Sequence, residues 1–335
     1  MSYTKKTGTF RSSDDSCDVA YYIFTPDRNP KAILQICHGM CEYIERYERE
    51  GFVSDMTARG YAVCGCDHIG HGHTASSEGE LGYFADYKSL ADNQRLLYDL
   101  MRKTYRSLPY ILFGHSMGSF VARDYIARHV STVDGAVICG TSGINKQVGF
   151  GIFLTSLLEL FRGGHHRSLL VAGLSNLHRN DSWRDESDTC SWLNDDKENR
   201  ARYHADKLSS FTFTVRAYNQ LMRMLKYVSS PEWYEAVPKS LPIFIMSGAL
   251  DPLGGNGSGV REVFDKLDDM ELSDLKLELY ENGRHELLNC TVRDAVIADL
   301  DTWADSVIEG VRLARTGYGG YGDTVSFNSQ RNREF

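Results

Sequence analysis

The sequence predicts an α/β fold in which a mostly parallel central sheet is flanked by helices and interrupted by a helical insertion. Two observations carry this prediction. Short apolar runs alternate with segments of helical pattern from residue 32 to 139 and again from 243 to 313, and such alternation is typical of a parallel sheet covered by helices. Between the two halves, residues 142–238 contain no clear apolar strand, which indicates an insertion made of helices.

The first half supplies most of the expected sheet. Its strands are short and apolar throughout, as is usual for parallel strands buried on both faces. Gly60 is expected to end the first helix. The expected strands cover 32–37, 61–66, 110–113 and 134–139, after extended segments at 7–13 and 17–25, and the expected helices cover 46–59, 87–105 and 117–129.

The second half resumes the strand rhythm after the insertion, with strands at 243–246 and 276–280 and helices at 259–267 and 291–313. We therefore expect an α/β core formed by residues 1–141 and 239–313, and a helical insertion, here called the cap, over 142–238. The tail from 314 to 335 is rich in Gly, Tyr, Ser and Asn and lacks periodicity, so it is predicted to be disordered.

Composition excludes several classes of protein. The chain has 335 residues and a formal net charge of −8, which argues against a nucleic-acid partner because such proteins need a basic face. No apolar run follows the N-terminus as a signal peptide requires, and none approaches the ~20 residues of a membrane span. The eight cysteines are scattered, which predicts reduced thiols and a cytoplasmic protein.

Ser116 is the first candidate catalytic residue. It lies in Gly114-His115-Ser116-Met117-Gly118, directly between a predicted strand and a predicted helix. A serine at the tip of such a turn needs small residues two positions before and after it, because the backbone doubles back on itself. A glycine-rich loop with no catalytic role can show the same Gly-x-Ser-x-Gly pattern, but its position between a strand and a helix favours a nucleophilic serine.

A serine needs a base, and the base needs an orienting acid. Catalytic side chains lie at the carboxyl ends of parallel strands. Asp251 follows the strand at 243–246, and His285 follows the strand at 276–280. The chain order Ser, Asp, His is that of the α/β-hydrolase fold. The segment after the strand at 134–139 offers no carboxylate, which leaves Asp251 as the acid.

The oxyanion donors are expected to be two backbone N–H groups. One belongs to Met117, at the start of the helix behind the serine, and the other to Met40, in the loop His38-Gly39-Met40 after the first buried strand. Each such donor typically contributes ~2.7–4 kcal/mol to transition-state stabilisation.

Three other patterns have competing interpretations. His115 adjoins the serine, but a sharp turn directs neighbouring side chains away from each other, so local packing is favoured over a role as base. The glycine-rich run 254–261 lacks the Gly-Lys-Ser/Thr of a phosphate loop and is expected to be a turn. The third pattern consists of Asp67, His68, His71 and His73, which fit either a metal cluster or a tight loop beneath the active site. No metal and no cofactor are expected.

Five motifs together resemble the monoacylglycerol lipase/lysophospholipase group of α/β-hydrolases, often labelled serine aminopeptidase S33-like. They are His38-Gly39-Met40, Asp67-His68-Ile69-Gly70-His71-Gly72, the Ser116 turn, Ser247-Gly248-Ala249-Leu250-Asp251-Pro252 and Gly283-Arg284-His285-Glu286. The resemblance spans about residues 10–310. It implies a Ser116–His285–Asp251 triad, oxyanion donors at Met40 and Met117, and a cap over an acyl pocket. The implied substrate is a small acyl ester, a monoacyl lipid.

Other functions remain open at this point. A peptidase or amidase on the same triad needs a carboxylate in the cap to hold a free amine, and Glu159, Asp185, Glu186 and Asp188 are candidates. A non-catalytic hydrolase-fold binding protein commonly lacks a member of the triad, and a dehalogenase uses Asp as nucleophile. The apolar face of 150–161 fits packing on the core as well as contact with an acyl chain or a membrane surface. Substrate-binding residues and the oligomeric state are not predicted.

Overall fold

The computed structural model describes residues 2–144, 147–177, 179–183 and 188–316. Its centre is an eight-stranded sheet with the strand order β1-β2-β4-β3-β5-β6-β7-β8. The pairings β1–β2 and β2–β4 are antiparallel, and all others are parallel. The predicted mostly parallel sheet is thereby confirmed. The strands span Tyr3–Arg11 (β1), Asp18–Pro26 (β2), Ala32–Cys37 (β3), Tyr61–Cys66 (β4), Tyr110–His115 (β5), Gly135–Cys139 (β6), Ile243–Gly248 (β7) and Leu275–Tyr280 (β8).

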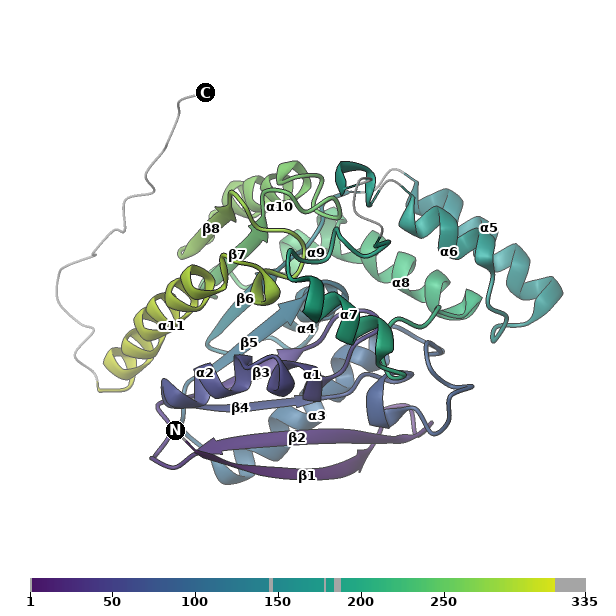
Figure 1. The fold of residues 1–335 in the computed structure, drawn as a ribbon. Coiled ribbons are helices and arrows are strands. Elements are labelled where there is room, and N and C mark those ends of the chain that lie inside the picture. Colours follow the sequence, from purple (N-terminus) through teal and green to yellow (C-terminus); the bar gives the residue numbers. More distant parts are fainter. Residues whose placement is uncertain (1, 145–146, 178, 184–187, 317–335) are drawn as a thin grey trace.

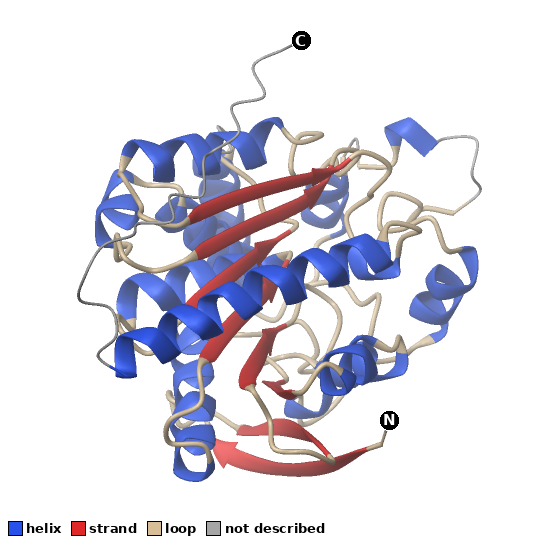
Figure 2. Cartoon of the chain, turned by 90° about the vertical axis from the view of Figure 1, so that its left-hand side faces the viewer, coloured by secondary structure: helices blue, strands red, loops and turns tan. Residues whose placement is uncertain are grey.

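Side chains of the parallel strands alternate between two apolar cores, one on each face of the sheet. In β5, Leu112 packs into one core, whereas Ile111 and Phe113 pack into the other. This alternation requires apolar residues at every position, which explains the unbroken apolar runs. Figure 2 shows helices on both faces. The first core is covered by α3 (Lys88–Thr104), α4 (Met117–Arg128) and α10 (Ser258–Asp269), and the second by α1 (Ile44–Arg49), α2 (Phe52–Ala58) and α11 (Arg293–Thr316).

The segment between β6 and β7, which we propose as the cap, is helical. In Figure 1 its helices α5, α6 and α8 gather at the right-hand side of the molecule. Side chains of Ser168, Asp196 and Thr214 accept hydrogen bonds from first-turn N–H groups of α6, α7 and α8, so each of these helices begins at a capping residue. The helices are α5 (Val148–Arg162), α6 (Leu169–Asn176), α7 (Lys197–Ala205), α8 (Val215–Val228) and α9 (Pro231–Ala236), and the 3₁₀ turn η2 covers Asp181–Trp183.

Two helices differ from the sequence prediction. The single helix expected over 46–59 is divided into α1 and α2, because Gly51 between them adopts φ 86°, a conformation that other residues disfavour. The last helix α11 continues to Thr316, three residues past its expected end. The predicted disordered tail from 314 therefore begins inside this helix, and residues 317–335 lie outside the described part of the chain. Short 3₁₀ turns also occur at Gly72–Thr74 (η1) and Leu287–Asn289 (η3).

Among the helices that the structure describes, none combines the length and the apolar character needed to cross a membrane. All eight cysteines are free thiols in the structure, and four of them, Cys37, Cys64, Cys66 and Cys139, lie in the central strands. The scatter of cysteines along the sequence therefore corresponds to unpaired side chains, six of which are buried.

Candidate active site

Ser116 stands on a sharp turn between β5 and α4. Its backbone adopts φ 56° and ψ −122°. The two flanking glycines are required by close contacts of the backbone. A Cβ atom on Gly114 would lie 2.3 Å from the carbonyl oxygen of Gly118, and a Cβ atom on Gly118 would lie 2.0 Å from the carbonyl oxygen of Cys37. The local sequence therefore folds as a strand–turn–helix elbow that presents the serine hydroxyl, as the pattern predicts.

The structure brings the three predicted side chains together. His285 Nε2 lies 2.8 Å from Ser116 Oγ, and His285 Nδ1 lies 2.8 Å from Asp251 Oδ2. Asp251 follows β7 and its other carboxylate oxygen accepts the N–H of Leu253 at 2.8 Å. All three side chains are buried. The arrangement can move a proton from the hydroxyl to the imidazole, with the carboxylate fixing the orientation of the ring.

The loop after β3 lies against the nucleophile. A Cβ atom on Gly39 would lie 3.1 Å from Ser116 Cβ, so the backbone approaches the serine closely. Met40, in this loop, and Met117, at the start of α4, both line the cavity that contains Ser116. The N–H of Met117 belongs to the first turn of a helix, where backbone donors have no intrahelical acceptor. Both predicted oxyanion residues are thus placed beside the serine.

A buried charged cluster, which the sequence did not predict, connects the loop after β3 with the loop that carries His285. Arg46 donates to Glu42 at 2.8 Å and to both oxygens of Glu286 at 2.7 and 2.8 Å. Glu42 also accepts the backbone N–H of Gly39 at 2.5 Å. We call Glu42, Arg46 and Glu286 the acid–arginine cluster. The only sequence signal was the position of Glu286 directly after the predicted base.

Electrostatics in the acid–arginine cluster favour ionised groups. Burial alone would raise the pKa of Glu42, but the hydrogen bond from His115 and the charge of Arg46 outweigh it and hold this pKa well below its usual value. The pKa of Glu286 is lowered for a similar reason, because Arg46 outweighs burial. Burial lowers the pKa of His115, but Glu42 overcompensates and raises it. His115 packs against Glu42 rather than the serine, as the sequence analysis expected.

Ser116 and His285 open into a cavity of about 520 Å³. Residues of the core and of the proposed cap both contribute to its walls. Its lining combines apolar side chains with polar ones, which come both from the core around Ser116 and from the proposed cap. The apolar walls come from Met40, Met117, Phe120, Ala172, Leu193, Phe211, Tyr218, Leu221 and Leu253, and the polar groups include Asn176, Arg179, Asn180, Thr189 and His204. A cavity of this size and composition can hold an acyl chain next to a polar group.

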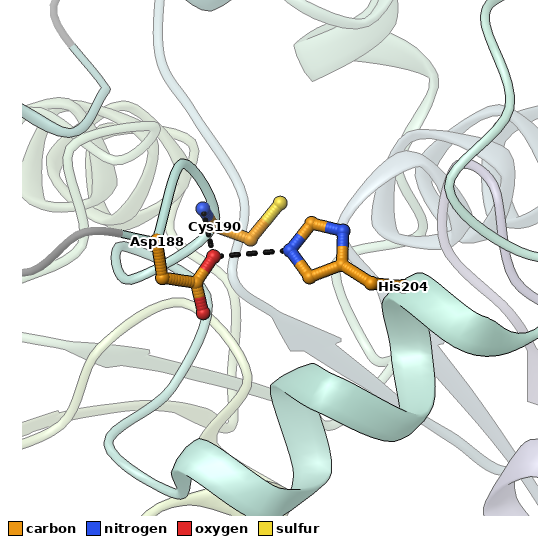
Figure 3. Close-up of side chains that lie close together, drawn as sticks. All are labelled: Asp188, Cys190 and His204. Atoms are coloured by element: carbon orange, nitrogen blue, oxygen red, sulfur yellow. Dashed lines mark hydrogen bonds and ion pairs between the residues drawn. The ribbon is translucent and has the colours of Figure 1, made fainter.

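Within the described residues, one group of side chains brings three metal-donor atoms within 4.8 Å of one another. It consists of Asp188, Cys190 and His204, which point toward one another in Figure 3. Such residue types suit Zn²⁺. The Asp188 carboxylate already accepts hydrogen bonds from His204 at 3.0 Å and from Arg200 at 2.6 Å. Burial raises the pKa of Asp188, but the Cys190 amide and Arg200 outweigh it and lower the pKa to about 2.

The other histidine-rich segment forms a tight loop. Asp67 accepts the N–H groups of Ile44 and His73 at 2.9 and 2.8 Å, and the hydroxyl of Tyr22 at 3.1 Å. A Cβ atom on Gly72 would lie 2.3 Å from the Asp67 carboxylate. The carboxylate therefore organises the backbone beneath the site, which agrees with the loop interpretation of this motif.

Comparison with known families gives the identity of the fold. The family model described as "Serine aminopeptidase, S33" (Hydrolase_4) matches residues 28–290. The chain belongs to this family. The resemblance to the monoacylglycerol lipase group and the predicted α/β-hydrolase fold are both confirmed.

Relatives of this S33-family chain include proteins named as lipases. The monoacylglycerol lipase of Mycolicibacterium smegmatis is 23% identical over 290 residues, which cover 85% of this chain and 92% of the relative. The monoglyceride lipase of Mus musculus is 24% identical over 304 residues, which cover 88% of this chain and 87% of the relative.

Solved structures similar to this S33-family chain cover nearly all of it. The carboxyl esterase of Bacillus coagulans superposes with a TM-score of 0.83 and 29% identity, over 92% of this chain and 99% of that one. A soluble variant of monoglyceride lipase from Saccharomyces cerevisiae has a TM-score of 0.73 and 18% identity, over 92% and 96% of the two chains. The second likeness supports the fold alone. Together with the lipase relatives, the first places the chain among the carboxylic ester hydrolases.

Proposed function

We propose that this protein is a serine hydrolase that cleaves carboxylic esters of monoacyl lipids, of lysophospholipase or monoacylglycerol lipase type. The observation that carries the proposal is the chain of two 2.8 Å contacts from Ser116 through His285 to Asp251. Each of the three residues comes from a different strand end, and such convergence of nucleophile, base and acid is the geometry that acyl transfer requires.

In the proposed mechanism, His285 Nε2 takes the proton of the Ser116 hydroxyl as its oxygen attacks the ester carbonyl carbon. Asp251 stabilises the imidazolium that forms. The imidazolium then gives its proton to the departing alcohol as the ester C–O bond breaks, which leaves an acyl group on Ser116. Water, deprotonated by the same imidazole, attacks the acyl carbon and releases the carboxylic acid and the free serine.

The N–H groups of Met40 and Met117 are proposed to donate to the carbonyl oxygen as it gains negative charge. Their support is position, because both residues line the cavity next to Ser116. The hydrogen bond from Gly39 N–H to Glu42, at 2.5 Å, fixes the loop that carries Met40. A donor held in place before reaction stabilises the transition state without a cost of reorganisation.

A monoacyl substrate is favoured by the apolar lining of the cavity and by the names of the relatives, which include monoacylglycerol and monoglyceride lipases. The phospholipase YtpA of Bacillus subtilis, which is 29% identical over 119 residues, covering 36% of this chain and 43% of the relative, keeps phosphate-bearing lipids within the proposal.

The outer surface of the proposed cap supports delivery from a lipid surface. Nine large apolar side chains of α5, α6 and the residue after α6 are exposed. Such an amphipathic surface lies in the headgroup region of a bilayer, with its apolar side chains in the acyl boundary. We propose that this exposed face contacts the membrane transiently. Its members are Phe150, Phe153, Leu157, Leu160, Phe161, Leu169, Leu170, Leu174 and Leu177.

An amidase or peptidase is the second candidate, because the family description contains the word aminopeptidase. It has less support from the described carboxylates. Glu159 is paired with Arg216 at 2.9 Å, and Asp188 is paired with Arg200 and His204. Asp185 and Glu186 lie outside the described residues. Both described carboxylates thus already interact with cationic side chains of the protein.

The test is an initial-rate panel with wild type and Ser116→Ala on a monoacylglycerol, a lysophosphatidylcholine, nitrophenyl esters and an aminoacyl amide. We expect ester turnover in the wild type and a loss of kcat of at least about 10³-fold in the variant, since a triad without its nucleophile is inactive. Thermal unfolding should be unchanged. Wild-type rates in the folded variant contradict the triad, and turnover of the amide alone supports the peptidase alternative.

A further inference from the structure

One cationic side chain of the cavity wall is not used by the proposed mechanism. Arg179 lies just after α6 and lines the cavity that contains Ser116 and His285. Its guanidinium carbon is 4.9 Å from the centre of the Trp192 ring, as in a cation–π contact. The same Trp192 ring lies 4.9 Å from the His285 ring. The Trp192 ring thus lies next to both the His285 imidazole and the Arg179 guanidinium.

The guanidinium of Arg179 is distinguished by its lack of an acceptor. Within the described parts of the chain, this guanidinium forms no hydrogen bond and no ion pair. In contrast, the buried side chains of Arg46 and Arg200 pair with carboxylates, and that of Arg123 donates to backbone carbonyls. Burial also lowers the pKa of Arg179. Arg179 is partly exposed and lines the cavity, so an anion supplied by a ligand can reach it and accept charge-assisted hydrogen bonds that no described residue accepts in the free protein.

We propose that Arg179 is an anion-binding residue for the head group of the substrate, which is then an acyl ester with a phosphate or carboxylate near the scissile bond. This assignment rests on the proposed esterase function and narrows it. A guanidinium recognises such groups with two parallel N–H donors. Because Arg179 and His285 both lie next to the Trp192 ring and line the same cavity, an anion held by Arg179 is close to the reacting carbonyl.

The surroundings of Arg179 fit a head group better than an acyl chain. Asn176 and Thr189 line the same cavity and supply further hydrogen-bonding groups, whereas the Asn180 amide is already bonded to backbone groups of Asp188 and Trp192. An acyl chain placed here would remove water from an unpaired charge, which is costly. The apolar part of the wall, including Phe120 and Leu221, offers the chain a better site.

The test compares two esters with the same short acyl chain, used below the concentration at which they aggregate. One is a neutral monoacylglycerol and the other is the matching acylglycerol phosphate. The measured quantity is the ratio of kcat/KM for the anionic ester to that for the neutral ester. We expect Arg179→Gln to lower this ratio by about ten- to a hundredfold, the range of a charge-assisted hydrogen bond, and Arg179→Lys to restore part of it. Arg162→Gln, which removes an exposed cation on α5, is the matched control and should leave the ratio unchanged.

A second measurement separates this proposal from the esterase function. The affinities of the two esters for Ser116→Ala, with and without Arg179→Gln, are compared by calorimetry, which needs no turnover. The subsite is supported if Ser116→Ala binds the anionic ester more tightly than the neutral ester and if adding Arg179→Gln abolishes this difference. This holds even if the wild type hydrolyses neither ester. An equal loss for both esters makes Arg179 structural and overturns the proposal. Arg179-dependent inhibition by inorganic phosphate without a preference for the anionic ester indicates a free-anion site and also overturns it.

Discussion

At Ser116 the backbone is held in a conformation that L-residues rarely adopt. Its φ of 56° is secured from both sides: its N–H donates to the carbonyl of Cys139 at 2.9 Å, and its carbonyl accepts the N–H of Ser119 at 2.8 Å. Strained dihedrals persist only where surrounding contacts over-determine them. The strand next to β5 and the first turn of α4 supply those contacts, so the position of the serine hydroxyl is a property of the elbow as a whole.

Gly118→Ala tests the elbow. The added Cβ atom would lie 2.0 Å from the carbonyl oxygen of Cys37, and backbone cannot move aside as a flexible side chain can. We expect a loss of about 1–3 kcal/mol in the free energy of unfolding, as for overpacked sites, together with a large loss of esterase activity. Urea unfolding and initial rates provide the measurement.

Gly310→Ala is the matched control for this prediction. Gly310 lies in α11, where an added Cβ atom meets nothing within 4 Å. Because alanine favours helix more than glycine does, the control should be stabilised by up to about 1 kcal/mol. Unchanged stability and activity of Gly118→Ala would show that the elbow relaxes easily, against the geometry described here.

Single residues differed in how well the sequence predicted them. Ser116, Asp251 and His285 could be placed because each follows a strand in a characteristic order. The acid–arginine cluster could not, since Arg46 and Glu286 are 240 residues apart in the chain. A charged residue is usually exposed, and only the folded structure shows that these charges meet in the interior. Arg179 belongs to the same class, because only the folded structure shows that none of the described residues pairs with its guanidinium.

Among the secondary-structure elements, α1 has the widest influence on the site. It carries Arg46, which joins Glu42 in the loop before α1 to Glu286 in the loop after β8. The two loops also hold Gly39 and His285, so one guanidinium connects the proposed oxyanion side with the base side. Burial of two carboxylates is tolerated because each receives a charge-assisted hydrogen bond.

Arg46→Met should therefore be strongly destabilising. The Arg46, Glu42 and Glu286 side chains are 3%, 4% and 6% exposed, and removing one partner of such a buried pair costs about 3–5 kcal/mol. The cost should be measured by urea unfolding near neutral pH. Arg95→Met, which breaks an exposed helical ion pair with Asp99, is the control and should cost less than about 0.5 kcal/mol.

The pH dependence of this cost follows from the lowered pKa values of Glu42 and Glu286. Since both pKa values lie below 4.5, the usual value, in the folded protein, the stabilisation is complete above that pH and is lost as pH falls through the folded values. In Arg46→Met, burial raises both pKa values, so the carboxyls take up protons at higher pH. The destabilisation should shrink between pH 7 and pH 5, and a constant cost would argue against charge as its cause.

Secondary-structure elements were predicted well where burial leaves a clear pattern. The parallel strands β3 to β7 are buried at every position, so continuous apolar runs identified them. The break between α1 and α2 escaped prediction, because the left-handed conformation of Gly51 depends on tertiary packing and glycine adopts other conformations equally well.

On the scale of the whole molecule, the most unusual surface is the exposed apolar face of the proposed cap. Leu160 is 77% and Leu169 is 85% exposed, and a fully buried leucine gains about 1.5–3 kcal/mol relative to an exposed one. Leu160→Glu combined with Leu169→Glu should lower binding to phosphatidylcholine vesicles several-fold in a sedimentation assay. Hydrolysis of a water-soluble nitrophenyl ester should be unaffected, because neither side chain lines the cavity.

Leu313→Glu is the control for membrane contact, since Leu313 is a 47% exposed leucine on α11, outside the cap. It should leave vesicle binding unchanged. If the wild type and the double variant bind vesicles equally, the apolar face of the proposed cap does not contact the membrane. The sequence predicted an insertion over 142–238 from its missing strands, but the side on which its apolar face is exposed depends on how α5 packs against α8.

The order of the strands has a consequence for biosynthesis. Ser116 and His285 are 169 residues apart, and Asp251 precedes His285 by 34 residues. A ribosome therefore completes the serine elbow and the cap long before it adds the base. Because a serine hydroxyl is unreactive without its base, a partly synthesised chain holds a silent nucleophile. We therefore expect ester cleavage by the proposed triad to begin only after β7 and β8 have joined the sheet.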